Sequence, residues 1–170
     1  PCRSIHPLPT KWLIANRQAD PERIAITGFS YGGYLSAYAL TYGAAYFTHG
    51  MAGGSVTDWS LYDTHYTERY MGTPQTNPDG YKKSSVMQYT HQYKGMLQLV
   101  HGLIDENVHP QNTIRLTTDL QMKNKTFELM LYSGNRHGIT GKQGIHHYNL
   151  KNRFIYEHLI QKPIPPSLLR

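Results

Sequence analysis

A G-x-S-x-G pentapeptide stands at residues 28–32, with the sequence GFSYG. Residues 23–27 before it form a short apolar run typical of a buried strand, and residues 34–42 after it are typical of a helix. A tight strand-to-helix turn would present the Ser30 hydroxyl at the carboxyl edge of a sheet and aim the Tyr31 N–H at a developing oxyanion. The glycines are expected because only small neighbours let the strand and the helix pass close together. The pentapeptide therefore predicts a nucleophilic serine, and the alternative is a glycine-rich turn with an incidental serine.

A nucleophilic hydroxyl needs a base, and the base needs a carboxylate that fixes its tautomer. Where the serine lies on such a turn, the chain order is serine, then acid, then histidine. Asp105 follows the apolar run at residues 96–101, and His137 follows the run at residues 126–132. Because ligand and catalytic groups gather beyond the carboxyl ends of parallel strands, we expect Ser30, Asp105 and His137 to lie together.

The chain offers other residues for these two roles: His101, His146 and His147 for the base, and Glu106 and Asp119 for the acid. His101 precedes Asp105, which is the wrong order for the base, and the other two histidines lie farther from the last strand. Asp105 is preferred as the acid because it comes first after the strand and its glycine turn. The alternative for Asp105 is a loop carboxylate that caps the next helix.

The elements that must position these residues alternate along the chain. Strands are expected at residues 23–27, 49–56, 96–101 and 126–132, and helices at residues 10–18, 34–42, 60–71, from 110 onward and at 146–161. Residues 72–80 are expected to form a polar loop, and residues 163–170 a proline-rich tail. The alternation predicts an α/β fold with a mostly parallel sheet and helices on both faces.

Composition excludes several classes of protein. The 170 residues contain no run of about 18 apolar residues, so no membrane-spanning segment is expected. The net charge of +6 is scattered over the chain without a nucleic-acid-binding motif, so nucleic acid is not an expected partner. Cys2 is the single cysteine, and the adjacent His146 and His147 do not share a helix face. Neither an internal disulfide, nor a metal site, nor a cofactor is therefore expected.

Four motifs in the same order resemble the catalytic domain of the prolyl oligopeptidase family, and most closely its dipeptidyl peptidase IV branch. They are GFSYGGY at residues 28–34, YDTHYTERYMG at 62–72, HGLIDENVH at 101–109 and RHG at 136–138. The likeness runs from about residue 23 to about residue 161. It implies an α/β-hydrolase fold, in which several strands normally precede the serine turn.

The resemblance implies a role for each matched residue. Ser30 would be the nucleophile, His137 the general base and acid, Asp105 its orienting partner, and the N–H of Tyr31 an oxyanion donor. A small pocket for the proline or alanine before the scissile bond would be lined by Val56, Trp59, Tyr62, Tyr66 and Val108, and Asn107 would hydrogen-bond a substrate carbonyl. Aromatic walls suit a flat pyrrolidine ring. From the residues alone, the tyrosines at 62, 66 and 70 are also typical of one buried helix face.

The sequence departs from the family pattern at Phe29, where Trp is usual, and at His49, where vertebrate members have a cysteine. Because 29 residues precede Ser30, we expect residues 10–162 to form only the carboxyl-terminal part of the hydrolase domain, without the early strands and the family's β-propeller. The strand before Ser30 would then be an edge strand. Residues 1–9 form a lead segment without a match, and residues 163–170 a tail.

The predicted function is a serine-type peptidase that releases amino-terminal dipeptides after proline or alanine. Its partners would be peptides with proline or alanine second from the amino terminus, and the family implies a homodimer. Two alternatives remain. One is an oligopeptidase or acylaminoacyl-peptidase of the same family, and the other is a non-catalytic remnant or interaction module.

Overall fold

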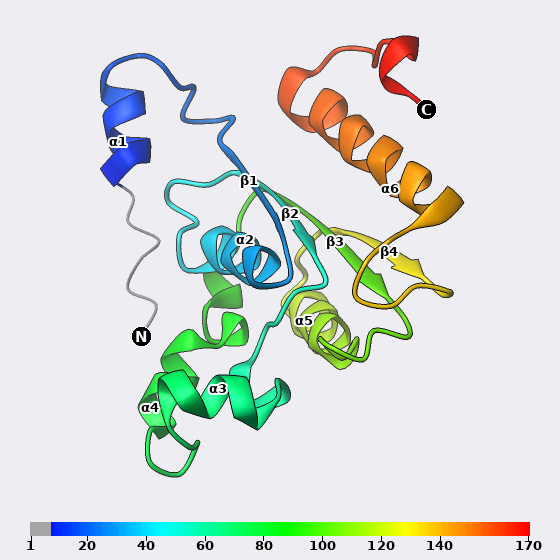
Figure 1. Ribbon diagram of the computed structural model, residues 1–170. Helices are drawn as coiled ribbons and strands as arrows, with labels where there is room; N and C mark the ends of the chain where they lie inside the picture. The colour runs from blue at the N-terminus through cyan, green and yellow to red at the C-terminus, as the bar shows by residue number, and fades with distance from the viewer. Residues whose placement is uncertain (1–7) are drawn as a thin grey trace.

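A four-stranded parallel sheet forms the centre of the computed structural model, which describes residues 8–170 (Figure 1). Its strands are β1 (Ala25–Phe29), β2 (His49–Gly53), β3 (Met96–Gly102) and β4 (Glu128–Tyr132), and their spatial order is β1-β2-β3-β4. All three neighbouring pairs are parallel, so the four carboxyl ends meet at one edge. Within the described residues β1 and β4 are the outer strands, and β1 pairs with β2 alone. The predicted α/β fold is confirmed.

Six α-helices occupy the described chain: α1 (Leu8–Ala15), α2 (Tyr31–Thr41), α3 (Thr64–Met71), α4 (Pro78–Ser84), α5 (Gln111–Met122) and α6 (Gly141–Phe154). The shorter turns are η1 (Trp59–Leu61), η2 (Val86–Gln92), η3 (Ile155–Ile160, a π-helix) and η4 (Pro166–Leu168). One face of the sheet packs against α2 and α5, and η2 packs against both of these helices. On the other face, side chains of α6 and of β1, β2 and β3 surround a cavity of about 190 Å³.

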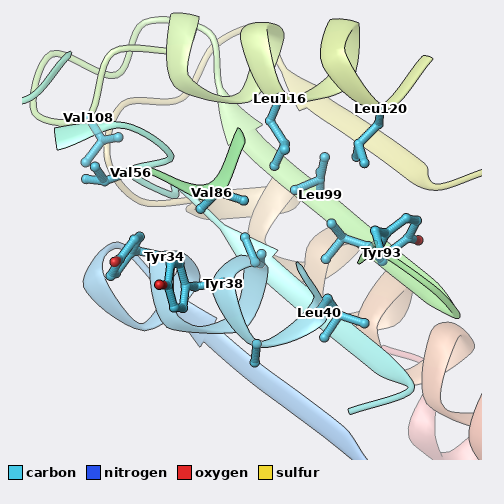
Figure 2. Packing of buried hydrophobic residues seen from close by; sticks show 14 of the residues in the cluster. Tyr34, Tyr38, Leu40, Val56, Val86, Tyr93, Leu99, Val108, Leu116 and Leu120 are labelled. Atoms are coloured by element: carbon cyan, nitrogen blue, oxygen red, sulfur yellow. The ribbon is translucent and has the colours of Figure 1, made fainter. Parts of the chain in front are cut away.

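The densest packing lies on the face covered by α2 and α5. Figure 2 shows Leu116 and Leu120 of α5 above Leu99 of β3, and all three side chains are fully buried. From α2, Tyr34 is buried in the same cluster, and its hydroxyl donates to the Ser84 carbonyl at 3.0 Å. Burial of the Tyr34 hydroxyl costs little free energy because the hydroxyl is hydrogen-bonded, and the bond helps to fix the position of α2. The core therefore holds α2, and with it the turn that precedes α2.

Several boundaries differ from those expected. The helix expected at residues 60–71 is divided into η1 and α3, because Asp63 accepts from the Tyr66 N–H and begins a new helix. The loop expected at residues 72–80 ends earlier than predicted, because α4 begins at Pro78. The Asn77 side chain caps this helix by accepting from the Gly80 N–H at 3.1 Å. The last helix begins at Gly141 instead of residue 146, with a polar first turn that no apolar periodicity marks.

The two terminal segments were assigned no structure from the sequence. Residues 1–7 of the lead segment lie outside the described residues, and residues 8 and 9 begin α1. The tail returns to α6, where the Asn149 and Asn152 side chains donate to the carbonyls of Arg170 and Leu168, each at 3.0 Å. The guanidinium of Arg170 lies 4.2 Å from the centre of the Tyr148 ring. These three contacts fix the tail against the helix.

No helix within residues 8–170 is long and apolar enough to cross a membrane.

Candidate active site

Ser30 lies on the turn between β1 and α2. Its backbone has φ 59° and ψ −119°, a left-handed conformation that side chains rarely adopt. The Ser30 N–H donates to the Gly53 carbonyl at 2.8 Å, and the Ser30 carbonyl accepts from the Tyr34 N–H at 2.9 Å. These two bonds hold the turn from the side of β2 and from the first turn of α2. Strain of this kind persists only where the surrounding structure over-determines the backbone.

Close approach of the backbone explains two glycines near this turn. A Cβ atom at Gly28 would lie 2.3 Å from the carbonyl carbon of Gly32, and a Cβ atom at Gly33 would lie 2.4 Å from the Gly53 carbonyl oxygen. A Cβ atom at Gly32 would meet nothing within 4 Å. The expectation that the motif glycines allow close passage is therefore right for Gly28 and wrong for Gly32. The second glycine that the packing needs is Gly33.

The backbone strain predicts that two variants of Ser30 will differ in stability. We expect Ser30→Gly to be more stable than Ser30→Ala by about 1 kcal/mol, because glycine adopts this φ freely and alanine keeps the strained Cβ. Both variants lose the hydroxyl equally, so their difference isolates the backbone. Urea unfolding of the two proteins measures it, and an alanine variant at least as stable as the glycine variant would contradict the strain.

The structure brings the three residues that were predicted to lie together into one chain of hydrogen bonds. His137 Nε2 lies 2.8 Å from Ser30 Oγ, and His137 Nδ1 lies 2.8 Å from Asp105 Oδ2. Because a carboxylate only accepts, Nδ1 donates to Asp105 and Nε2 is left to accept from the serine hydroxyl. Ser30 follows β1, Asp105 follows β3 and His137 follows β4, so all three come from the carboxyl edge of the sheet.

Asp105 is held from two sides. Its side chain is fully buried, and Oδ1 accepts from the backbone N–H of Asn107 at 3.0 Å and of Val108 at 2.9 Å. Helix α5 is preceded by Pro110 and receives no side-chain cap. The alternative of a carboxylate capping the next helix is therefore wrong. A buried carboxylate needs hydrogen-bond donors on both of its oxygens. Here the two backbone N–H groups bind Oδ1, and Oδ2 is left to accept from His137.

The competing acids and two of the competing histidines lie in other contacts. Glu106 is exposed and pairs with Arg136 at 2.9 Å, and Asp119 pairs with Lys123 at 2.6 Å. A backbone hydrogen bond lowers the pKa of Glu106, and the Arg136 guanidinium lowers it further. His146 Nδ1 lies 2.9 Å from the Tyr132 hydroxyl, and the His147 ring lies 6.5 Å from the Phe29 ring. Burial lowers the pKa of His147.

The six residues expected to bind the substrate, five as the lining of a pocket and Asn107 through a hydrogen bond, include three in the core. Val56, Trp59 and Val108 are buried, and Figure 2 shows Val56 beside Val108. The rings of Tyr62 and Tyr66 lie 5.9 and 6.2 Å from the Trp59 ring. The sixth residue, Asn107, accepts from the Tyr62 hydroxyl at 2.7 Å, and burial raises the pKa of that tyrosine. An aromatic wall therefore meets the loop that carries Asp105.

The alternative interpretation, in which Tyr62, Tyr66 and Tyr70 form one buried face of a helix, is wrong. Tyr62 precedes α3, whose first turn is capped by Asp63. Tyr66 is 41% exposed and Tyr70 is 67% exposed, whereas α3 buries Thr67. Tyrosines left in solvent on a short helix do not build a core, so these rings are available for contact.

Two side chains near the site had no assigned contact in the sequence. The ring of Tyr31 lies 5.7 Å from the Trp59 ring and extends the aromatic wall, although the motif pointed only to its backbone N–H. His101 was considered solely as a rival base, and its Nε2 lies 3.3 Å from Asp105 Oδ2. No sequence signal marked this contact, because a spacing of four residues brings side chains together on a helix, whereas His101 lies in a strand and Asp105 in the loop that follows. In the part of the chain that the structure describes, no three His, Cys, Asp or Glu side chains are grouped as metal ligands.

A parallel sheet with a strained serine between its first strand and the following helix defines the α/β-hydrolase fold. The sequence pattern of the prolyl oligopeptidase family matches residues 9–162, and the chain belongs to this family of serine peptidases. The chain is 38% identical over 143 residues to probable dipeptidyl-aminopeptidase B of Neurospora crassa and 42% identical over 134 residues to human dipeptidyl peptidase 8. These matches cover 82% and 77% of this chain.

A solved structure gives the same result in three dimensions. The crystal structure of Porphyromonas gingivalis dipeptidyl peptidase 4 superimposes with a TM-score of 0.85 at 38% sequence identity. The match covers 88% of this chain and 22% of that chain. The chain likewise spans 15% of the length of each of the two curated relatives.

Proposed function

We propose that Ser30, His137 and Asp105 are the reacting triad of a dipeptidyl peptidase. The observation that carries the proposal is the unbroken chain of two 2.8 Å hydrogen bonds from Ser30 Oγ through His137 to Asp105 Oδ2. The names of the relatives, dipeptidyl-aminopeptidase B, dipeptidyl peptidase 8 and dipeptidyl peptidase 4, support the class of substrate.

The proposed reaction is acyl transfer from the peptide to Ser30 and then to water. Ser30 Oγ attacks the carbonyl carbon, and His137 Nε2 takes the hydroxyl proton. Asp105 accepts the Nδ1–H bond and stabilises the imidazolium that forms. The backbone N–H of Tyr31, in the first turn of α2, donates to the oxyanion where the helix N-terminus also favours negative charge. His137 then returns the proton to the leaving amine, and a water molecule releases the dipeptide by the reverse sequence.

The proposed specificity is for proline or alanine next to the scissile bond. The rings of Trp59, Tyr62 and Tyr66 meet at centre-to-centre distances of 5.5–6.2 Å and form a shallow aromatic wall. A pyrrolidine ring buries its flat faces well against such a wall, whereas a branched leucine side chain fits it poorly. Asn107, fixed by the Tyr62 hydroxyl, would donate from its amide nitrogen to a substrate carbonyl.

We expect Tyr66→Ala to lower kcat/KM about fivefold on a Gly-Pro reporter and much less on a Gly-Leu reporter, because the wall contributes about 1 kcal/mol to the pyrrolidine contact. Tyr70→Ala is the matched control, since Tyr70 is the next tyrosine on the same helix and is more exposed. The assay uses the full protein that carries this sequence. Equal rates on the two reporters in the unsubstituted protein would contradict the proposed specificity.

A fluorophosphonate probe tests the reacting serine separately from specificity. It should label Ser30 in the unsubstituted protein and leave Ser30→Ala unlabelled. Labelling that survives in Ser30→Ala, or folded protein that resists the probe, would refute the assignment of the nucleophile.

A further inference from the structure

His101 is a fully buried histidine beside the candidate triad. It lies at the end of β3, four residues before Asp105, and has no exposed surface. Its Nδ1 lies 2.7 Å from Thr113 Oγ1, and its Nε2 lies 2.8 Å from the Val108 carbonyl oxygen. The same Nε2 lies 3.3 Å from Asp105 Oδ2. One ring therefore touches both ends of the loop that carries the carboxylate.

The contacts of the ring determine its tautomer. A carbonyl oxygen only accepts, so the atom that faces the Val108 carbonyl, Nε2, must carry the proton. The same N–H also faces the Asp105 carboxylate, which is a second acceptor. Nδ1 then accepts from the Thr113 hydroxyl. The opposite tautomer would set a lone pair on Nε2 against the oxygens of Val108 and Asp105 and would leave three acceptors facing one another.

The Val108 carbonyl connects this bond to the carboxylate. The backbone N–H groups of Asn107 and Val108 hold Asp105 Oδ1, while the carbonyl of Val108 is held by His101. The Val108 carbonyl and the Val108 N–H lie in consecutive peptide planes that share the Val108 Cα, so a displacement of the carbonyl is passed through that one residue to the N–H. Asp105 would then lose part of the support that directs Oδ2 toward His137.

We infer that His101 is a positioning residue that fixes the 105–108 loop and thereby aims Asp105 at His137. This inference rests on the proposed function, because its effect on rate requires the Ser30–His137–Asp105 triad. His101 acts through Asp105 and touches neither Ser30 nor the reacting carbonyl.

Burial is consistent with a neutral ring. Burial lowers the pKa of His101, and this lowering is larger than the increase caused by the Val108 carbonyl and by the Asp105 charge. A neutral ring leaves the negative charge of Asp105 to be balanced by His137, which is the residue that must become an imidazolium during the reaction.

Three variants separate positioning from simple packing. His101→Phe keeps an aromatic ring of similar size and removes both hydrogen bonds. His101→Gln offers an amide N–H near the Nε2 position and an acceptor oxygen for Thr113. His91→Phe is the control, because His91 is an exposed histidine at the end of η2.

We expect His101→Phe to lower kcat on a Gly-Pro reporter about 10–100-fold with KM nearly unchanged. A loss of this size is typical when a residue that orients a reacting side chain through hydrogen bonds is removed. His101→Gln should restore kcat to within about fivefold of the unsubstituted protein, and His91→Phe should leave it unchanged. If His101 were needed only for packing, His101→Phe would lower the fraction of folded protein but would leave kcat and KM per active site unchanged. The concentration of active sites is therefore measured by titration with the fluorophosphonate probe.

A second measurement does not depend on turnover. The Nδ1 proton of His137, hydrogen-bonded to Asp105, should give a strongly downfield proton NMR signal that disappears in His137→Gln. In His101→Phe this signal should move upfield or broaden, and in His101→Gln it should persist. If the unsubstituted protein neither hydrolyses the reporter nor reacts with the probe, the proposed function fails while the NMR comparison still tests the contact.

The inference is overturned if folded His101→Phe keeps both the kcat and the NMR signal of the unsubstituted protein. Thr113→Val covers the case in which His101→Phe does not fold, because it removes only the hydroxyl that donates to His101 Nδ1 and helps to hold the ring in place. We expect Thr113→Val to lower kcat about three- to tenfold, since one hydrogen bond contributes about 1 kcal/mol. Unchanged kcat and an unchanged signal in that variant would equally overturn the inference.

Discussion

Asp105→Asn is expected to lower kcat on a Gly-Pro reporter about 10⁴-fold, with the fold retained. If the asparagine oxygen keeps the N–H groups of Asn107 and Val108, its amide nitrogen faces His137 and turns Nδ1 into an acceptor. Nε2 then carries the proton and cannot accept one from Ser30. Steady-state kinetics with circular dichroism as the check on folding measures the loss.

The matched control for this variant is Glu106→Gln. Glu106 is the neighbouring carboxylate and competed with Asp105 for the role of acid, but its side chain is exposed and pairs with Arg136 at the surface. An exposed pair contributes little, so kcat should stay within about twofold. A loss of activity in Glu106→Gln as large as that in Asp105→Asn would show that the wrong carboxylate had been assigned.

Gly28→Ala is expected to destabilise the protein by about 3 kcal/mol and to lower activity about 100-fold. The new Cβ would lie 2.3 Å from backbone atoms of Gly32, and backbone cannot turn away as the end of a flexible side chain can. Either β1 or the start of α2 must shift, and the shift moves Ser30 away from His137. Chemical unfolding gives the loss of stability, and the rate of fluorophosphonate labelling gives the loss of reactivity.

Gly32→Ala provides the comparison within the same pentapeptide. Its Cβ would meet nothing within 4 Å, and alanine favours the helix by up to about 1 kcal/mol over glycine. We therefore expect stability that is equal or slightly higher, and labelling at a similar rate. If both alanine variants were equally harmful, the close approach at Gly28 would not be the reason for its glycine.

The sequence was sufficient for the alternation of strands and helices and for the expectation that Ser30, Asp105 and His137 lie together. Apolar runs of five to eight residues separated by helices specify a parallel sheet, and such a sheet places Ser30, Asp105 and His137 at one edge wherever the exact boundaries fall. This explains why errors of several residues at helix ends, as at Gly141, did not affect the predicted grouping.

Contacts that depend on side-chain packing were not predictable in the same way. Gly32 and Gly33 are adjacent and chemically identical, and only the path of β2 past α2 decides which of them is crowded. The tyrosines at 62, 66 and 70 fit a helical period, but Asp63 starts the helix after Tyr62 and turns Tyr66 and Tyr70 to solvent. The bond from His101 to the Val108 carbonyl required the folded loop.

The serine and the histidine come from the two outer strands of the described sheet, and 107 residues separate them in the chain. Contacts between such distant residues form late in folding, because the loop between them must first be closed by the intervening structure. An intermediate in which β1 or β4 has not yet paired cannot bring Ser30 to His137, even if α2 and the core around β3 are already native. In the proposed mechanism, Ser30 can therefore react only after both outer strands, β1 and β4, have joined the sheet.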